Sequence, residues 1–384
     1  MSVKISEPTY KRFVVGDVPR FDEAKNVFSR AIRGEFYPPS TAPQADTVAP
    51  HQGFFRYDPD RDAKPGYSRT DYALRWAGRT IDRTARRHLL GRETEPTSPP
   101  VEIDDPRRMT RLVKKTARWF GADLVGVALL NRDWIYSHRG DHSVAATRIG
   151  DVGEPIELPA YLTHVIVMAI EEDYRTTRRS LALETATDLG YSKMGIVTPM
   201  LARFIQELGY HALASGNDTG LSIPLAVDAG LGELGRNGLL ITDRFGPRVR
   251  LCKVFTDLPL VPDAPVDLGV QAFCEICARC AESCPAGSVG DGERTADAGH
   301  PSINVNVLKW PVIPDPCYKF WLGQRAHCSN CIRVCPFNKP DTRFHMAVRS
   351  LVANLPQFNR LCKWSDDRLG YGKQILGDPD DEFF

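Results

Sequence analysis

The chain has 384 residues, of which 42% are hydrophobic and 25% are charged, and its formal net charge is +1. This length suits about two or three globular domains, and the near-neutral charge argues against nucleic acid or an anionic membrane surface as the main partner. The longest strongly apolar stretch, around residues 161–170, is too short to cross a bilayer and is followed by Glu171 and Glu172.

The first 105 residues are rich in proline, arginine and aspartate, which predicts a segment that wraps or links the rest of the protein. Within this segment, residues 70–90 are compatible with a helix that has a basic face. The start of the chain shows neither an apolar signal core nor a twin-arginine motif. We therefore expect a cytoplasmic protein, in a compartment where thiols remain reduced.

From residue 106 to about residue 262 the pattern changes to one of alternating strands and helices, which favours a layered α/β domain. The helices are predicted from apolar residues at helical spacing, and the strands from short apolar runs. The expected elements are helices over residues 109–120, 176–189 and 194–208 and strands over residues 122–130 and 163–170. The order of the strands in the sheet does not follow from this pattern.

A glycine-dense segment follows at residues 229–238. It contains the spacing G-x-G-x-x-G, but a dinucleotide site needs that spacing between a strand and a helix, and Gly238 would end such a helix early. Backbone without side chains also allows a bulky flat ligand to approach closely. We expect this second use and predict cofactor contacts from Gly230, Gly232, Gly235, Asn237 and Gly238.

Eight of the ten cysteines fall in two runs, each closed by a Cys-Pro pair. The runs are Cys274-x2-Cys277-x2-Cys280-x3-Cys284 and Cys317-x10-Cys328-x2-Cys331-x3-Cys335. This spacing is typical of two-cluster ferredoxins, in which the fourth Cys of each run binds the other cluster. Residues 263–340 are therefore predicted to hold two [4Fe–4S] clusters. The ligand sets are Cys274, Cys277, Cys280 and Cys335 for one cluster, and Cys317, Cys328, Cys331 and Cys284 for the other.

Paired CxxC units also bind zinc, which is the alternative for these cysteines. Four ligands in a tight row, closed by proline and then repeated, are more typical of a cluster. The remaining Cys252 and Cys362 are expected to be small core residues. Residues 341–384 are expected to form a C-terminal helix and a surface tail.

Several stretches, taken together, resemble the corrinoid-dependent reductive dehalogenases. The resemblance covers roughly residues 105–340 and, more weakly, the N-terminal stretches Tyr10-Lys-Arg-Phe13 and Asn26-Val-Phe28. Its most specific parts are Leu208-Gly-Tyr210, the segment from Ile223 to Ile241, the segment from Arg250 to Leu260, Phe273 to Ala281, Cys317-Tyr-Lys-Phe-Trp321 and Cys335-Pro-Phe-Asn-Lys339. The two cysteine runs alone would indicate only a two-cluster protein.

The resemblance implies a nitroreductase-like α/β core that holds a base-off cobalamin, and a ferredoxin-like module whose two [4Fe–4S] clusters feed electrons to cobalt. The implied reaction replaces a halogen on an organohalide by hydrogen. By motif, the catalytic Tyr falls on Tyr191, the Asn or Lys position on Asn217 and the basic partner on Arg250, while Thr187 and Trp321 would line the substrate pocket. An Arg beside Tyr191 would stabilise its phenolate and make it a better proton donor.

The chain differs from the family in lacking a twin-arginine leader and a fused reductase tail. An external ferredoxin or reductase is then the expected electron donor. Two alternatives stay open. Epoxyqueuosine reductase, a corrinoid enzyme that acts on transfer RNA, has a similar cluster module, although an RNA enzyme usually carries a basic face. A simple two-cluster electron carrier would leave some 260 residues before the module unexplained.

Overall fold

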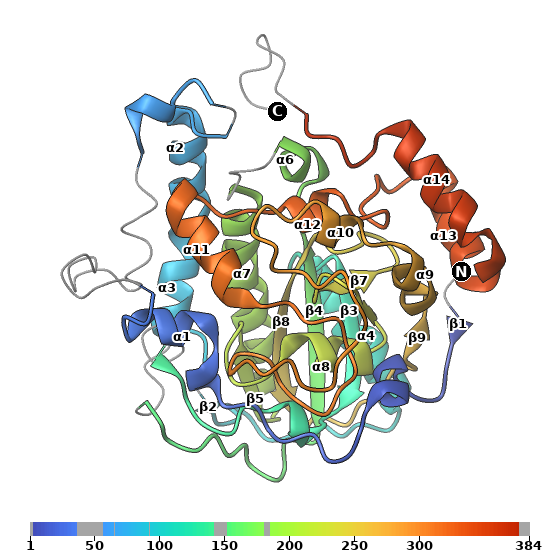
Figure 1. The fold of residues 1–384 in the computed structure, drawn as a ribbon. Coiled ribbons are helices and arrows are strands. Elements are labelled where there is room, and N and C mark those ends of the chain that lie inside the picture. Colours follow the sequence, from blue (N-terminus) through green and yellow to red (C-terminus); the bar gives the residue numbers. More distant parts are fainter. Residues whose placement is uncertain are drawn as a thin grey trace.

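The computed structural model describes residues 3–36, 57–64, 66–91, 93–141, 152–179 and 185–375. Five strands form the central sheet, and every neighbouring pair in it is antiparallel (Figure 1). In spatial order they are β2 (Glu93–Thr94), β5 (Ala212–Ser215), β8 (Val249–Thr256), β4 (His164–Glu171) and β3 (Leu124–Leu129). The two predicted strands are thus confirmed as β3 and β4.

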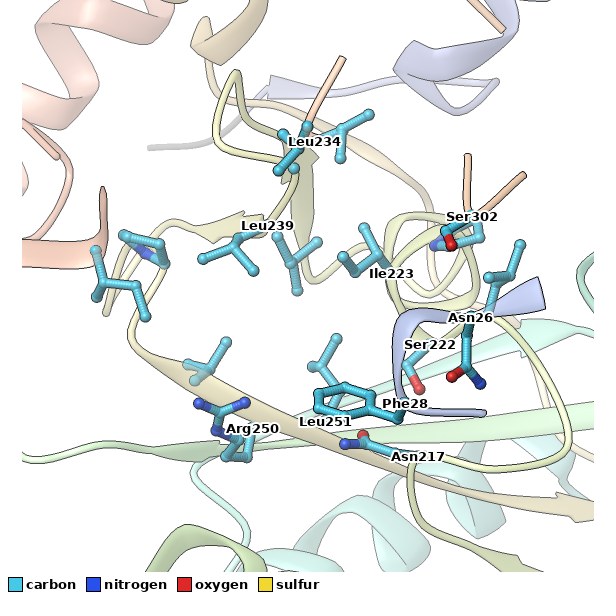
Figure 2. Close-up of a pocket in the computed structure, with 18 of the residues that line it drawn as sticks. Asn26, Phe28, Asn217, Ser222, Ile223, Leu234, Leu239, Arg250, Leu251 and Ser302 are labelled. Carbon is cyan, nitrogen blue, oxygen red and sulfur yellow. The ribbon is translucent and has the colours of Figure 1, made fainter. Parts of the chain in front are cut away.

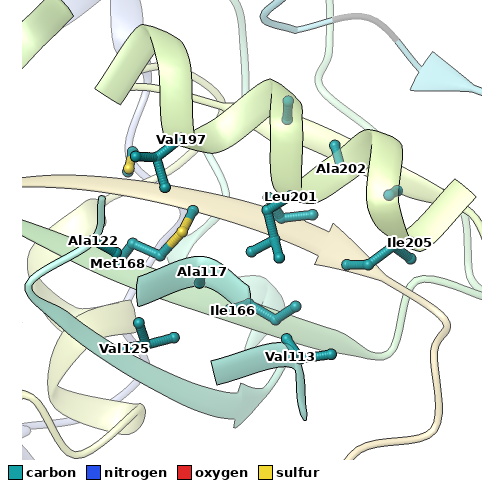
Figure 3. Close-up of a cluster of buried hydrophobic side chains, with 14 of the residues drawn as sticks. Val113, Ala117, Ala122, Val125, Ile166, Met168, Val197, Leu201, Ala202 and Ile205 are labelled. Atoms are coloured by element: carbon teal, nitrogen blue, oxygen red, sulfur yellow. The ribbon is translucent and has the colours of Figure 1, made fainter. Parts of the chain in front are cut away.

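One face of the sheet is covered by α4 (Pro106–Trp119) and α7 (Thr185–Glu207). Side chains alternate between the two faces of a strand, so each strand contributes every second residue to this core. Figure 3 shows Val197 and Leu201 of α7 above Ile166 and Met168 of β4, all at most 2% exposed. This packing fixes α7, which carries Tyr191, against the sheet.

The opposite face is covered by α8 (Ser222–Asp228) and by a hairpin of β6 (Gly232–Leu234) and β7 (Leu240–Thr242). Val165, Val167 and Phe255 point to this face and are fully buried there. Mixed helices and strands in layers confirm the coarse α/β prediction. The G-x-G-x-x-G spacing lies in this hairpin and not between a strand and a helix, so the dinucleotide interpretation is excluded.

The N-terminal part contributes α1 (Val27–Ile32), α2 (Arg69–Gly78) and α3 (Thr80–His88). The single helix expected over 70–90 is therefore two helices, which meet at Arg79. Both pack along α7. Part of the predicted basic face is turned inward, because Arg75 and Arg79 pair with the fully buried Asp188 of α7 at 3.2 and 2.9 Å.

Most remaining elements belong to the cysteine-bearing and C-terminal parts of the chain. The helices are α6 (Tyr174–Arg179), α9 (Val270–Ile276), α10 (Arg279–Glu282), α11 (Pro314–Gln324), α12 (Asn330–Arg333), α13 (Arg343–Asn354) and α14 (Asn359–Leu369). Short 3-10 helices span Thr9–Phe13, Glu23–Lys25, Pro59–Arg61, Arg132–Trp134 and Pro356–Phe358. Strand β1 (Val3–Lys4) pairs with β9 (Val266–Asp267) just before the first cysteine run.

The predicted boundary near residue 189 is wrong, because α7 continues from Thr185 to Glu207 without interruption. Gly190 lies within this helix, and a Cβ atom there would lie 3.0 Å from Cγ of Arg250, so that side chain would have to shift slightly. The predicted stop at Gly209 is confirmed by its positive φ of 85°. Within the described ranges, no helix is long and apolar enough to span a membrane.

Candidate active site

A cavity of about 630 Å³ lies between the sheet, α8, the β6–β7 hairpin and the cysteine-bearing part of the chain. Figure 2 shows Arg250, Leu251 and Asn217 along one wall, with Ile223 and Leu239 across from them. The wall also includes Tyr191 and Thr187 of α7, Trp321 of α11, and Cys328. The structure therefore brings all five predicted catalytic and pocket residues to one cavity.

Tyr191 and Asn217 are joined by a hydrogen bond in which Asn217 Nδ2 donates to Tyr191 Oη at 2.8 Å. A phenol oxygen that accepts one hydrogen bond still has its own hydrogen to donate. Tyr191 packs at the edge of the buried core, and Asn217 follows β5. The hydroxyl is thereby held in place by a neighbour that leaves its proton available.

Arg250 reaches the same point from β8. Its Nε donates to Glu172 Oε1 at 2.9 Å and its Nη2 to Thr187 Oγ1 at 3.0 Å, and Thr187 also donates to Glu172 at 2.7 Å. Its guanidinium lies 5.3 Å from the centroid of the Tyr191 ring. Burial alone would lower the pKa of Arg250, but the charges of Glu172 and Tyr191 outweigh it and raise that pKa. A permanent cation therefore faces Tyr191.

The loop that carries Asn217 is anchored by Lys253, a side chain with no exposed surface. Its Nζ donates to the Gly216 carbonyl at 2.7 Å and to Ser222 Oγ at 3.1 Å. Burial lowers the pKa of Lys253 to about 8. This buried cation ties β8 to the Asn217 loop and to the first residue of α8.

The eight cysteines of the two runs are free thiols and fall into two groups. Burial is the largest cause of the raised pKa of Cys335, and the next is the charge of Cys274, followed by Cys280 and Cys277. The pKa of Cys331 is raised by burial and then by Cys328, Cys317, Cys280 and Cys284. Cys274 and Cys335 pack against the same buried cluster, which contains Cys277. Burial, and then the charges of Cys328 and Cys284, raise the pKa of Cys317. Both observations suit the predicted crossover.

Each predicted ligand set supplies four thiols, the number that a [4Fe–4S] cluster takes, one on each iron. Within the described ranges, no three His, Cys, Asp or Glu side chains form a site for a single metal ion. Burial, with a smaller contribution from neighbouring thiols, raises the pKa of Cys274 and of Cys317 to about 12 each. Thiols in such surroundings become thiolates when a metal supplies positive charge.

The five residues predicted to contact a cofactor separate into different roles. Gly238 lines the cavity, whereas a Cβ on Gly230 would lie 2.4 Å from the Ala264 oxygen and one on Gly232 would lie 2.2 Å from the Ile241 oxygen. A Cβ on Gly235 would instead meet the side chains of Asn237 and Ile241, at 2.8 Å each. These three glycines allow close packing within the protein itself, and their predicted contacts with a cofactor stay a prediction.

Asn237 does not line the cavity either. Its Nδ2 donates to the Cys331 carbonyl at 3.3 Å, and the neighbouring Arg236 donates to the Cys274 carbonyl at 3.0 Å. Arg236 also lies over the Trp310 ring, 4.3 Å from its centroid. The tip of the β6–β7 hairpin therefore holds backbone from both cysteine runs.

Other cavity residues escaped the sequence analysis. Arg79 and Arg86 come from the N-terminal segment, where the basic face of residues 70–90 was visible but not its direction. His327 packs against Trp321 in a tilted arrangement with ring centroids 4.5 Å apart, and both rings line the cavity. Several residues between 302 and 312 add to the wall from a stretch without any motif. Only the folded chain brings these distant segments together.

Comparison with known proteins shows which proteins this chain is similar to. The chain is 37% identical over 323 residues to tetrachloroethene reductive dehalogenase of Sulfurospirillum multivorans, covering 78% of this chain and 64% of that protein. The chain belongs to the reductive dehalogenase family. It spans less than two thirds of the length of that relative. No protein-family profile matches the chain.

The fold agrees with this family. A solved structure of the catabolic reductive dehalogenase NpRdhA, in complex with 3-bromo-4-hydroxybenzoic acid, superposes with a TM-score of 0.74 at 24% identity, covering 98% of this chain and 50% of that one. The epoxyqueuosine reductase of Listeria monocytogenes is 34% identical over 147 residues, which is 37% of this chain and 36% of that protein. The similarity to the dehalogenases thus extends over about twice as much of the chain.

Proposed function

We propose that this protein is a reductive dehalogenase that carries out R–X + 2e⁻ + H⁺ → R–H + X⁻. The observation that carries the proposal is the composition of the cavity. Tyr191, Asn217 and Arg250 meet at its wall, and Cys328, from the second cysteine run, forms another part of the same wall. A proton donor and an electron-transfer ligand therefore border one space.

The cavity is the proposed site of a base-off cobalamin. Bound cobalamin would supply the low-potential cobalt chemistry that breaks the carbon–halogen bond. The residues that would hold it are Gly238, Leu239 and Leu240 of the hairpin, and Ile223 and Val227 of α8, which line the cavity with apolar surface. Ligand pockets of this kind are mainly apolar with a few placed polar groups.

Tyr191 is the proposed proton donor. Because Asn217 donates to its oxygen, the phenolic hydrogen is free to point to a substrate in the cavity. The guanidinium of Arg250 over the ring stabilises the phenolate that forms when the proton leaves. Thr187 and Glu172 orient Arg250, and Trp321 closes the aromatic side of the pocket.

The two cysteine groups are the proposed ligands of two [4Fe–4S] clusters. Cys328 lines the cavity, so the cluster held by Cys317, Cys328, Cys331 and Cys284 would be the one beside the reacting centre. The other cluster would accept electrons from an external ferredoxin or reductase. Ten cysteines without a disulfide suit a reducing compartment, and we propose the cytoplasm.

The finer architecture is part of the same proposal. Residues 106–262 would be the nitroreductase-like, corrinoid-binding core and residues 263–340 the ferredoxin-like module. Residues 1–105 would wrap the core, as the packing of α2 and α3 along α7 supports. Residues 341–384 would add a C-terminal helical segment and tail, of which 376–384 lie outside the described residues.

Anaerobic reconstitution with iron, sulfide and cobalamin tests the proposal. We expect about eight irons and one corrinoid per chain, and halide release from organohalides with reduced viologen as donor. Iron without corrinoid would indicate an electron carrier. Tight, salt-dependent binding of transfer RNA without halide release would instead favour the epoxyqueuosine reductase reaction.

The same reconstituted protein tests whether the cobalamin binds in its base-off form. His327 lines the cavity, so it is the histidine to examine as an axial ligand among the described residues. A cobalt(II) EPR spectrum without nitrogen splitting supports base-off binding. Nitrogen splitting that disappears in His327→Ala would replace that part of the proposal by histidine ligation.

A further inference from the structure

A second guanidinium, that of Arg86, lies over Tyr191 from the side of α3. Its carbon is 5.0 Å from the ring centroid, compared with 5.3 Å for Arg250. Arg86 lines the cavity, and 16% of its side chain is exposed. Tyr191 is therefore flanked by two cations that come from distant parts of the chain.

Only one of the three side-chain nitrogens of Arg86 donates a hydrogen bond to another described residue. Its Nε donates to Asp82 Oδ1 at 2.6 Å, one helical turn earlier on α3. Within the described part of the chain, neither terminal nitrogen has a hydrogen-bond partner, and neither is among the buried polar atoms. The outer edge of this guanidinium is thus open to the cavity.

The carboxylates nearest to Arg86 are shared with other groups. Asp188 is completely buried and accepts from Arg75 and Arg79. Asp82 accepts from Nε of Arg86 and also pairs with Arg79 at 3.7 Å. Arg250 has its own acid, Glu172. The open edge of Arg86 is where a ligand in the cavity can meet this guanidinium.

We propose that Arg86 is a specificity residue that binds an anionic, two-oxygen substituent of the organohalide, such as a carboxylate on a haloaromatic ring. The planar fork of a guanidinium matches the two oxygens of a carboxylate, whereas a departing halide offers a single atom. This inference rests on the proposed function of the cavity. It differs from the neutral substrate in the name of the Sulfurospirillum relative, tetrachloroethene.

Two ligands of equal shape test the proposal, 3-bromobenzoate and the neutral 3-bromobenzamide. Their dissociation constants are measured by calorimetry on the anaerobically reconstituted protein, before any electron donor is added. A charge-assisted hydrogen bond is worth about 1.5–3 kcal/mol, so we expect the carboxylate to bind roughly tenfold to hundredfold more tightly than the amide. Arg86→Met should abolish this preference and leave amide binding nearly unchanged.

Arg86→Lys keeps the charge without the fork and should retain only part of the preference, which also provides a milder variant if Arg86→Met is unstable. Asp82 keeps Arg79 as an ion-pair partner at 3.7 Å in both variants. Arg111→Met, an equal charge change at an exposed site on α4, should keep the full preference. Equal affinity for both ligands in the unaltered protein, or a preference that survives Arg86→Met, overturns the inference. A clear preference without bromide release on reduction would instead count against the proposed reaction alone.

Discussion

The Tyr191 side of the cavity and the cysteine module differ in how many of their polar groups have a hydrogen-bond or ion-pair partner within the protein. Around Tyr191, the donors and charges mostly meet partners within the chain: Asn217 on the hydroxyl, Glu172 on Arg250, and Asp188 on two further arginines. In the cysteine module, burial raises the pKa of Cys331 and of Cys335, and the charges of other cysteines raise both pKa values further.

This contrast teaches which part of the site is preorganised. Hydrogen bonds and ion pairs fixed by a rigid scaffold can be in place before any ligand arrives. Buried thiols that oppose each other's ionisation gain their stabilising partner only when iron binds. We therefore expect the Tyr191 side to retain its structure without cofactors and the cysteine module to depend on them.

The largest expected effect is from Cys331→Ala. Removing a ligand of the cluster proposed next to the cavity should reduce iron from about eight to about four per chain and abolish halide release, because electrons no longer reach the cavity. Iron analysis and a viologen-coupled halide assay measure this. Cys362→Ala is the matched control, since Cys362 lies outside both ligand sets and should keep all iron. Full iron in Cys331→Ala would refute the assignment of Cys331 as a cluster ligand.

Tyr191→Phe should have the next largest effect. It removes the proposed acid but leaves the ring between Arg86 and Arg250, so both cofactors should bind normally. General acid catalysis contributes about a hundredfold to ten-thousandfold, and halide release should fall within that range. Tyr210→Phe, which loses only a hydroxyl bonded to the Val101 carbonyl, should keep normal turnover. Unchanged turnover in Tyr191→Phe would remove Tyr191 from the reaction.

Asp188→Asn tests whether buried ion pairs hold the Tyr191 side together. The substitution leaves Arg75 and Arg79 without their shared charge in a buried site, which should lower the free energy of unfolding by about 3–5 kcal/mol. Urea unfolding of the reconstituted protein measures it. Glu207→Gln, on the same helix but in an exposed ion pair with Arg203, should change stability by less than about 1 kcal/mol. Equal effects of the two variants would contradict the preorganised picture.

The smallest expected effect concerns Glu233, whose Oε2 accepts from the backbone of Leu268 and Val270 where α9 begins. Burial raises the pKa of Glu233 to about 7 from its usual value of 4.5. The folded state therefore favours the protonated form. The stabilising contribution of this form is fully present below about pH 4.5 and is lost as the pH rises from there through about 7. That loss is at most about 3 kcal/mol.

Glu233→Gln should remove this pH dependence while keeping an acceptor for the two backbone donors. Urea midpoints at pH 6 and pH 8 compare the variants: the unaltered protein should lose more stability between these values than Glu233→Gln. Parallel pH profiles would show that Glu233 does not titrate in this range. The result also concerns the hydrogen bonds between the hairpin and the cysteine module, because Glu233 of β6 accepts from the backbone where α9 begins.

The sequence by itself determined the parts of this protein that local pattern controls. Short apolar runs located β3 and β4, a period-3.6 repeat located α4, and the cysteine spacing marked all eight thiols of the two runs. The family motifs selected Tyr191, Asn217 and Arg250, which do meet at one cavity. Such features are readable because their information lies within a few adjacent residues.

Three features became clear only from the tertiary structure. They are the order of the strands in the antiparallel sheet, the continuity of α7 as one helix, and the reason why glycines stand at 230, 232 and 235. Each depends on how segments pack in space, as with the Ala264 carbonyl over Gly230. The tertiary structure also decided that Arg86 reaches Tyr191, since a basic helical face shows its charge in sequence but not its direction. Whether an arginine meets solvent, a buried acid or a ligand cavity is set by packing between segments, which no local pattern encodes.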